Sequence, residues 1–306
     1  MMNDETMRLV IGIDLGGTNI KAALIECGGG GVVASVSRLT LDGEYVDGVP
    51  RFALTVQEMV VELEERAGQG KLRAGLSAPG LARRDGRCIQ WMPGRMDGLE
   101  GLDWADFLGR EVRVLNDAHA ALLGEVWTGA GRGCEDVMML TLGTGVGGAV
   151  FSGGRLLRGC LGRAGHLGHI SVDGKAARDD FNTPGSLEDM IGNQSLWRRC
   201  GGRYANTHAL VAAAAAGDSV AAGLWLESVR HLAVGMVSLI NVLDPELVIL
   251  GGGIAAGAGE QLLGPLRGWL DELEWRPGGH QVRLALAAAG EWAGALGSAW
   301  EVRGES

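Results

Sequence analysis

The chain carries the same glycine-rich turn twice, and each copy directly follows a short apolar run. In the first copy, residues 9–13 are apolar and β-branched, residues 14–19 read Asp-Leu-Gly-Gly-Thr-Asn, and residues 20–25 are apolar again. In the second, residues 137–142 precede Gly-Thr-Gly-Val-Gly-Gly, and an apolar run resumes at residue 149. Short apolar runs bounded by glycines predict strands. The sequence therefore predicts two similar β-hairpins and an internal duplication.

Turns of this composition are suited to phosphate. Glycines such as Gly16 and Gly17 have no Cβ, so a phosphate can approach their N–H groups, and Thr18 adds a hydroxyl donor. Asp14, at the end of the first strand, is placed to hold a hydrated Mg²⁺. Neither the P-loop spacing nor the dinucleotide fingerprint occurs here. An ordinary hairpin with Gly-Gly at its tip is the alternative for one copy, but two copies favour a phosphate chain held by both turns.

The order of predicted elements repeats in the two halves of the chain. The first half reads as three strands and then helix, strand, helix, strand, helix. The second half repeats this order, apart from a long region at residues 162–202 that shows no clear strand pattern. We therefore expect an α/β fold of two βββαβαβα domains that clamp a ligand, since ligands bind at strand carboxyl ends in such sheets. The expected elements include strands at 32–38, 72–76, 112–115, 247–250 and 282–286, and helices at 49–66, 117–126, 219–242 and 292–302.

Composition excludes several functional classes. The formal net charge of −10 disfavours nucleic acid or an anionic membrane as a partner. No apolar run approaches the ~18 residues that cross a bilayer. The five cysteines are dispersed without a CxxC pair, which is typical of reduced thiols. The acidic N-terminus is unlike a signal peptide. We expect a cytoplasmic protein.

A carboxylate follows the strand predicted at 112–115. Asp117 would begin the next helix, where a substrate can reach it, and a single carboxylate that accepts a hydroxyl proton is what phosphoryl transfer requires. The alternative is that Asn116 or Asp117 only caps this helix. The two phosphate-type turns favour catalysis. Asp117→Asn is then expected to abolish turnover and to preserve the fold.

Several of these motifs, taken in order, resemble the ROK (repressor, open reading frame, kinase) sugar kinases of the actin-like ATPase superfamily. The resemblance spans about residues 9 to 300. It implies two actin-like ATPase (ribonuclease H-like) domains with the active-site cleft between them. The first would comprise residues 1–117 with a C-terminal helix at about 291–306, and the second residues 118–290. The matching stretches are residues 14–18, 116–118, 142–148, 168–169 and 250–252, together with Asn241 and Pro245.

The resemblance further implies a glucokinase-like enzyme that transfers the γ-phosphoryl group of ATP to a hydroxyl of a hexose or hexose derivative. Asp117 would be the general base, and Asp14 would hold Mg²⁺ through water. Lys21 either adds positive charge near the phosphates or points to solvent. Nucleotide-binding positions carried over from the family are Gly16, Gly17, Thr18, Asn19, Thr144 and Gly145 for phosphates, and Gly251, Gly252 and Gly253 for adenosine. A simple strand-to-helix turn is the alternative for the last three.

The sugar side departs from the family pattern in two places. Typical members read Gly-Glu-x-Gly-His, and here His166 replaces the glutamate. A carboxylate accepts two hydroxyl donors, whereas a neutral imidazole accepts one and donates one, so the preferred hydroxyl pattern is expected to change. A loop histidine without a ligand is the alternative. Trp91 stands where many members have Asn, and would stack on a sugar or fill the cleft. Sugar-binding positions implied by the family are Pro79, Gly80, Asn116, Asp117, His166, His169 and Glu188.

The third departure concerns a metal. The family usually has Cys-x-Cys-Gly-x-x-Gly-Cys, a structural zinc site completed by the position of His169. Residues 179–186 read Asp-Asp-Phe-Asn-Thr-Pro-Gly-Ser, without any cysteine. Zinc requires about four good ligands in a tetrahedral array. We therefore expect no structural zinc.

Two other classes are open to test. A ROK repressor would carry a helix-turn-helix before the first glycine turn, and we expect none because few residues precede that turn. A non-catalytic sugar or nucleotide sensor of the same fold is harder to exclude, although Asp14, Thr18 and Asp117 are all retained. The expected partner is a small-molecule sugar, and the resemblance alone implies a homodimer.

Overall fold

The structure, a computed structural model, describes residues 8–304. The described chain divides into two compact units. Unit 1 contains residues 8–133, 158–164 and 288–304, and unit 2 contains residues 134–157 and 165–287. The domain limits expected at residues 117 and 291 stay predictions; helix α3 (Asp117–Thr128) lies in unit 1.

Each unit is built on a five-stranded sheet, and the two sheets have the same plan. The strand order is β3-β2-β1-β6-β9 in unit 1 and β12-β11-β10-β13-β14 in unit 2. The chain therefore has the two-sheet α/β architecture predicted from the duplicated hairpins. Unit 1 uses β1 (Leu9–Leu15), β2 (Asn19–Glu26), β3 (Val32–Leu39), β6 (Ala74–Ala78) and β9 (Val112–Asn116), and unit 2 uses β10 (Val137–Leu142), β11 (Val146–Ser152), β12 (Arg155–Leu156), β13 (Leu247–Gly251) and β14 (Arg283–Leu286).

In both units an antiparallel hairpin is extended by parallel strands. In unit 1, β2 pairs antiparallel with β1 and β3, while β6 pairs parallel with β1 and β9. Two boundaries differ from expectation. The strand expected at 72–76 lies at Ala74–Ala78. Strand β11 starts at Val146, because Gly147 and Gly148 pair with β10 and so belong to the ladder and not to the turn.

The remaining elements of unit 1 surround its sheet. Helices α1 (Arg51–Ala67) and α2 (Trp104–Leu108) supply Phe52, Met59 and Trp104 to the main core of this unit. Four short strands form two small sheets that the sequence pattern did not reveal, since two or three residues give no readable period. These are β4 (Tyr45–Val46), β5 (Val49–Pro50), β7 (Leu81–Ala82) and β8 (Ile89–Trp91).

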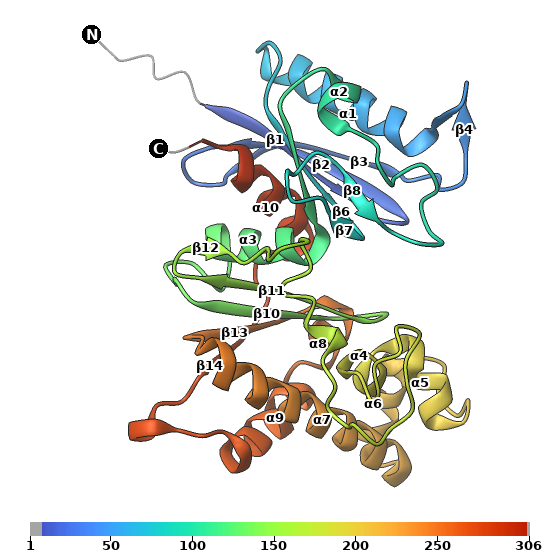
Figure 1. The fold of residues 1–306 in the computed structure, drawn as a ribbon, viewed down its shortest axis with the longest axis vertical. Helices are drawn as coiled ribbons and strands as arrows, with labels where there is room; N and C mark the ends of the chain where they lie inside the picture. The colour runs from blue at the N-terminus through green and yellow to red at the C-terminus, as the bar shows by residue number, and fades with distance from the viewer. Residues whose placement is uncertain (1–7, 305–306) are drawn as a thin grey trace. The chain divides into compact units, whose positions relative to one another are not determined.

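The last helix of the chain completes unit 1. Helix α10 (Ala293–Val302) packs on β1, β6 and α3, and Figure 1 shows it, in red, beside the blue strand β1. The close approach needs glycine: a Cβ on Gly12 would overlap the carbonyl oxygen of Ala295, and one on Gly75 would overlap that of Ser298. A helix can therefore lie directly on the middle of this sheet.

The helices of unit 2 were only partly predicted from the sequence. Helix α7 (Ser219–Leu243) matches the helix expected at 219–242, and Leu232 and Met236 lie in the core of the unit. By length and composition alone α7 could cross a bilayer, with a mean hydropathy of 1.3, but those two side chains are fully buried in the unit 2 core. Its other helices are α4 (Leu187–Ile191), α5 (Asn193–Cys200), α6 (Thr207–Ala215), α8 (Gly252–Ala258) and α9 (Glu260–Leu273).

Candidate functional site

Three polar residues of unit 1 meet at the carboxyl ends of neighbouring parallel strands. Asp14 lies on β1 directly opposite Ser77 of β6, and Ala78 lies opposite Asn116 of β9. The Ser77 hydroxyl donates to Asp14 Oδ1 at 3.0 Å. Because carboxyl ends of parallel strands form one edge of the sheet, this arrangement brings together residues that are far apart in the sequence.

The surroundings of Asp14 suit a cation. Burial raises the pKa of this carboxyl, and the negative charge of Asp117 adds to the rise, while the Ser77 hydrogen bond opposes it. Lys21 also opposes it, but its ammonium is 2.8 Å from Glu291 Oε2 and lies 5.8 Å from the Trp292 ring centroid. A desolvated carboxylate with a like charge nearby is stabilised by a hydrated divalent cation, so the donor set fits Mg²⁺.

Asn116 and Asp117 have different environments although they are adjacent. The side-chain oxygen of Asn116 accepts the N–H groups of Ala118 and His119, at 3.0 and 3.3 Å, so Asn116 is the cap of helix α3. Its amide nitrogen donates to the carbonyl oxygen of Gly80 at 2.9 Å. Asn116 is buried and Asp117 is exposed. The capping alternative therefore applies to Asn116, which leaves the carboxylate of Asp117 accessible.

The charge on Asp117 is only partly compensated. Its Oδ1 accepts the N–H of Ala118 at 2.8 Å. Desolvation by the surrounding protein raises the pKa of Asp117, although solvent reaches the side chain itself, and Ala118, Asn116 and Arg95 oppose the rise. A carboxylate with a raised pKa that substrate can reach is suited to accept a proton.

The first glycine turn is closed by a residue that the motif did not include. The N–H of Gly16 donates to the carbonyl oxygen of Asn19 at 3.0 Å. The buried Thr40 donates its hydroxyl to the Gly16 carbonyl at 2.6 Å and its N–H to the Thr18 carbonyl at 2.9 Å. Gly17, Thr18 and Asn19 are exposed at the tip. Thr40 thus fixes a turn whose predicted phosphate-binding positions face solvent.

Arg95 lies close to the same tip. Its Nη2 is 3.5 Å from the position that a Cβ on Gly17 would occupy. The positive charge of Arg95 also opposes the rise in the pKa of Asp117. No sequence motif includes this loop residue, and only the folded structure brings it to the turn.

The second glycine turn, in unit 2, is held by the start of helix α5. The N–H groups of Asn193 and Gln194 donate to the carbonyl oxygens of Gly143 and Thr144 at 3.0 and 2.8 Å. The N–H of Gly143 donates to the Gly145 carbonyl at 2.9 Å, and Thr144 is exposed. Since these bonds use carbonyl groups of the turn, they fix its conformation from one side.

Glu188, a predicted sugar ligand, lies directly against this second turn. Its Oε2 accepts the N–H of Val146 at 2.9 Å, and its Oε1 accepts the side-chain amide of Gln194 at 2.8 Å. A Cβ on Gly145 would overlap Oε2, so that glycine is required by the carboxylate itself. An ionised carboxylate offers about four acceptor positions, and Glu188 retains capacity for a hydroxyl.

The two histidines of the sugar motif lie together in unit 2. Their ring centroids are 6.5 Å apart and the rings are 27° from parallel. Burial lowers the pKa of His166, and the charge of His169 lowers it further. His166 is therefore neutral at pH 7, and it provides one donor and one acceptor.

A cavity of about 300 Å³ adjoins the glycines that follow β13. Gly252 has a φ of 84°, which favours glycine, and Gly252 and Gly253 are both exposed. The ring Nε2 of His208 is 3.0 Å from the carbonyl oxygen of Gly253. The cavity is lined by residues of α6 and α8 with one of α9, namely Thr207, His208, Val211, Ala212, Ile254, Gly257, Ala258 and Gln261.

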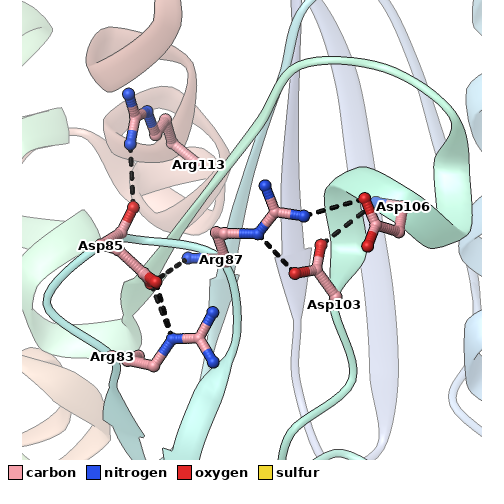
Figure 2. A network of polar contacts seen from close by, with 6 residues as sticks. All are labelled: Arg83, Asp85, Arg87, Asp103, Asp106 and Arg113. Carbon is pink, nitrogen blue, oxygen red and sulfur yellow. Dashed lines mark hydrogen bonds and ion pairs between the residues drawn. The ribbon is translucent and has the colours of Figure 1, made fainter.

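Pro79 and Gly80 lead into the β7–β8 hairpin, which a polar network anchors. Figure 2 shows Arg87 bonded to both Asp103 and Asp106, and Asp85 bonded to Arg83. Arg113 on β9 also reaches the Asp85 carbonyl at 2.8 Å. The network fixes the hairpin to β9 of the five-stranded sheet and to α2. Trp91 ends the hairpin with 49% of its surface exposed.

The family's structural zinc does not fit the residues present. Within residues 8–304, no group of three or more His, Cys, Asp or Glu side chains is arranged to hold a metal ion. The expected region offers His169, Asp179 and Asp180 and no cysteine, and these side chains are not grouped as a structural zinc site requires.

Known proteins match this chain over most of its length. A model of the ROK family matches residues 10–305. The glucokinase of Thermotoga maritima is 34% identical over 280 residues, which cover 84% of this chain and 86% of that protein. The crystal structure of a ROK hexokinase from Thermus thermophilus has a TM-score of 0.84 and 31% identity, covering 95% of this chain and 97% of the other. A ROK glucokinase from Streptomyces griseus in complex with glucose and AMPPNP has a TM-score of 0.74 and 28% identity, covering 95% and 98%.

Proposed function

Since this chain belongs to the ROK family and is an ATP-dependent sugar kinase, we propose that it transfers the γ-phosphoryl group of ATP to a hydroxyl of a hexose or hexose derivative, with Asp117 as general base. One observation carries the assignment of the base. Asn116 caps α3, so the neighbouring carboxylate of Asp117 is left exposed at the edge where β1, β6 and β9 end.

Catalysis of phosphoryl transfer depends mainly on positioning the two substrates and on stabilising the charge of the transferring phosphoryl group. Phosphoryl transfer proceeds through a loose transition state, in which the attacking hydroxyl loses its proton late. Asp117 accepts that proton, and its raised pKa makes it a better base than an ordinary surface aspartate. The side-chain amide of Asn116 donates a hydrogen bond to the carbonyl oxygen of Gly80, which fixes the backbone of Pro79 and Gly80 beside the base.

On the nucleotide side, the two glycine turns bind phosphates through Gly16, Gly17, Thr18, Thr144 and Gly145. Asp14 holds a hydrated Mg²⁺, which neutralises charge on the transferring phosphoryl group when bound. The adenosine lies at Gly251, Gly252 and Gly253, and the adjoining cavity of about 300 Å³ can receive its base.

On the sugar side, His166, His169 and Glu188 bind hydroxyls. Because His166 is neutral and Glu188 keeps free acceptor positions, this set offers donors as well as acceptors. Glucose is therefore one candidate among several hexoses and amino sugars. The glucokinase of Streptomyces griseus was solved with glucose and AMPPNP, which supports the same ligand classes here.

The test is release of ADP across a panel of hexoses and amino sugars, with wild type and Asp117→Asn. We expect at least one sugar to be phosphorylated, and a loss of about 10³-fold or more in kcat for the variant, with an unchanged unfolding temperature. Asp47→Asn, which alters an exposed carboxylate after β4, is the matched control and should keep full activity. Sugar binding without turnover for every sugar would favour a sensor, and a fully active Asp117→Asn would exclude this base.

We also propose a homodimer in solution, which rests on family resemblance alone. Light scattering after gel filtration measures the mass directly: twice the chain mass of 31.9 kDa supports it, and a monomer at micromolar concentration contradicts it.

A further inference from the structure

Residues 171–186 form a loop that contains the counterpart of the family's cysteine-rich segment, and hydrogen bonds close it. Within the loop, Oδ1 of the Asp179 carboxylate accepts the N–H groups of Phe181 and Thr183, at 2.9 and 2.8 Å. The backbone of Asp179 also pairs with its neighbours, donating to the Thr183 carbonyl at 3.0 Å and accepting from the Asn182 N–H at 2.9 Å. One aspartate thus closes a tight turn over residues 179–183.

The electrostatics of Asp179 agree with this role. Desolvation raises the pKa of the carboxyl, but the Ser186 side chain and the N–H groups of Thr183 and Phe181 outweigh it, and the pKa lies below its usual value. The carboxylate is therefore ionised at neutral pH, and its hydrogen bonds are of the strong, charge-assisted kind.

Both ends of the loop are attached to the rest of unit 2. Val172 donates its N–H to the carbonyl oxygen of Gly185 at 2.9 Å, and Gly185 donates its own to Ala177 at 2.9 Å. The Ser171 hydroxyl bonds to the carbonyl oxygen of Pro184 at 2.5 Å. The segment 171–186 is consequently a closed loop whose ends are joined by hydrogen bonds, with no metal-ligand bond needed.

The closed loop places one aromatic ring on the sugar motif. The ring of Phe181 meets that of His169 edge to face, with centroids 4.9 Å apart and planes at 73°. This is a favoured geometry for an aromatic pair. Phe181 is 52% exposed, so its contact with His169 is made at the surface and not within a hydrophobic core.

We propose that Phe181 is a positioning residue that sets the orientation of the His169 ring, and that the Asp179 turn takes over the role that a structural metal has in relatives. The proposal rests on the proposed function, because His169 matters to the sugar only if the protein binds one. The edge-to-face contact between the two rings restricts rotation of the imidazole.

The experiment compares Phe181→Leu and Phe181→Tyr with wild type in the full chain. Loss of one aromatic pair corresponds to about a two- to tenfold change in an equilibrium. Phe181→Leu should therefore raise KM for the sugar about two- to tenfold and leave kcat and KM for ATP within twofold. Phe181→Tyr keeps the ring and should restore the wild-type KM. Trp197→Ala removes a 73% exposed ring of the same unit and is the matched control.

A second measurement does not depend on turnover. In NMR spectra, the His169 ring protons of wild type should carry a ring-current shift that Phe181→Leu abolishes and Phe181→Tyr retains. If no sugar is phosphorylated, the proposed function fails, while these shifts still decide whether Phe181 orients the imidazole. Unchanged ring-current shifts in Phe181→Leu would overturn the proposal. Equal increases in KM for sugar and KM for ATP would overturn it as well.

A third measurement concerns the metal. Wild-type protein is dialysed against a chelator and assayed with fresh Mg²⁺, with and without added zinc. We expect the same KM for sugar in both cases. A KM that rises on dialysis and recovers with zinc would show that a metal, and not the Asp179 turn, holds the loop.

Discussion

Glu125 in helix α3 offers a quantitative test of how unit 1 is held together. Its side chain is fully buried, and the carboxylate accepts three backbone N–H groups. Oε2 accepts Ala130 at 2.8 Å, Oε1 accepts Ala289 at 2.8 Å, and Ala288 is shared between them at 2.8 and 3.0 Å. One carboxylate thus fixes the segment that leaves α3 and the segment that leads into α10.

The cost of losing this carboxylate follows from the count of donors. Glu125→Ala leaves three N–H groups without their acceptor, and each costs about 1 kcal/mol when water can reach it. We expect the free energy of unfolding to fall by about 3 kcal/mol, with a further loss from the cavity that the substitution leaves. Glu125→Gln has nearly the same shape but only one acceptor oxygen, so its NH₂ group faces an N–H donor. We expect the free energy of unfolding of that variant to fall by about 2 kcal/mol.

The assay is thermal and urea unfolding of wild type and both variants, with Glu65→Gln on the exposed side of α1 as the control. A loss of about 2 kcal/mol lowers the melting temperature by about 4–8 °C in a unit of this size. The control should change by less than about 0.5 kcal/mol. A Glu125→Gln variant that melts with wild type would refute the reasoning, because it would show that the second acceptor oxygen contributes nothing.

Three further predictions follow from the site. Thr40→Val removes the hydroxyl bond to the Gly16 carbonyl, and this should raise KM for ATP about fivefold and leave KM for sugar unchanged in steady-state kinetics. Asp14→Asn should be inactive yet more stable than wild type at pH 7. The folded-state pKa of Asp14 is raised, so ionisation destabilises the fold, and the gain should shrink as unfolding is measured toward pH 3.8. Burial lowers the pKa of His166, so KM for sugar should be constant at neutral and higher pH and rise only in acid, and His166→Gln should remove that rise.

The hairpins and the long core helix were predictable because their signals are local. A β-branched run that ends in Gly-Gly specifies both a strand and its turn, and this holds for β1 with Gly16 and Gly17. Helix α7 has apolar residues at helical spacing over many turns and an aspartate cap at Asp218, so a single pattern covers it completely.

The rest of the site depends on contacts that no local pattern encodes. Thr40 stands at the end of a strand without any motif, and only the pairing of β2 with β3 brings it under the Gly16 turn. Arg95 lies in an irregular loop after β8, and no local pattern predicts its approach to Gly17. Helix α6 is mostly alanine, whose uniform hydropathy gives no periodic stripe to read.

The place of α10 in unit 1 has a consequence for biosynthesis. Val10 and Ile25, near the beginning of the chain, share a hydrophobic cluster with Leu296 and Val302, near its end. While the ribosome is still translating, the sheet of unit 1 lacks the helix that covers this face. Nearly all of unit 2 has by then been made. In the usual order the N-terminal domain folds first. Here unit 1 cannot complete its fold until α10 has been made, after nearly all of unit 2. During that interval the face with Gly12 and Gly75 is the surface that a chaperone would shield.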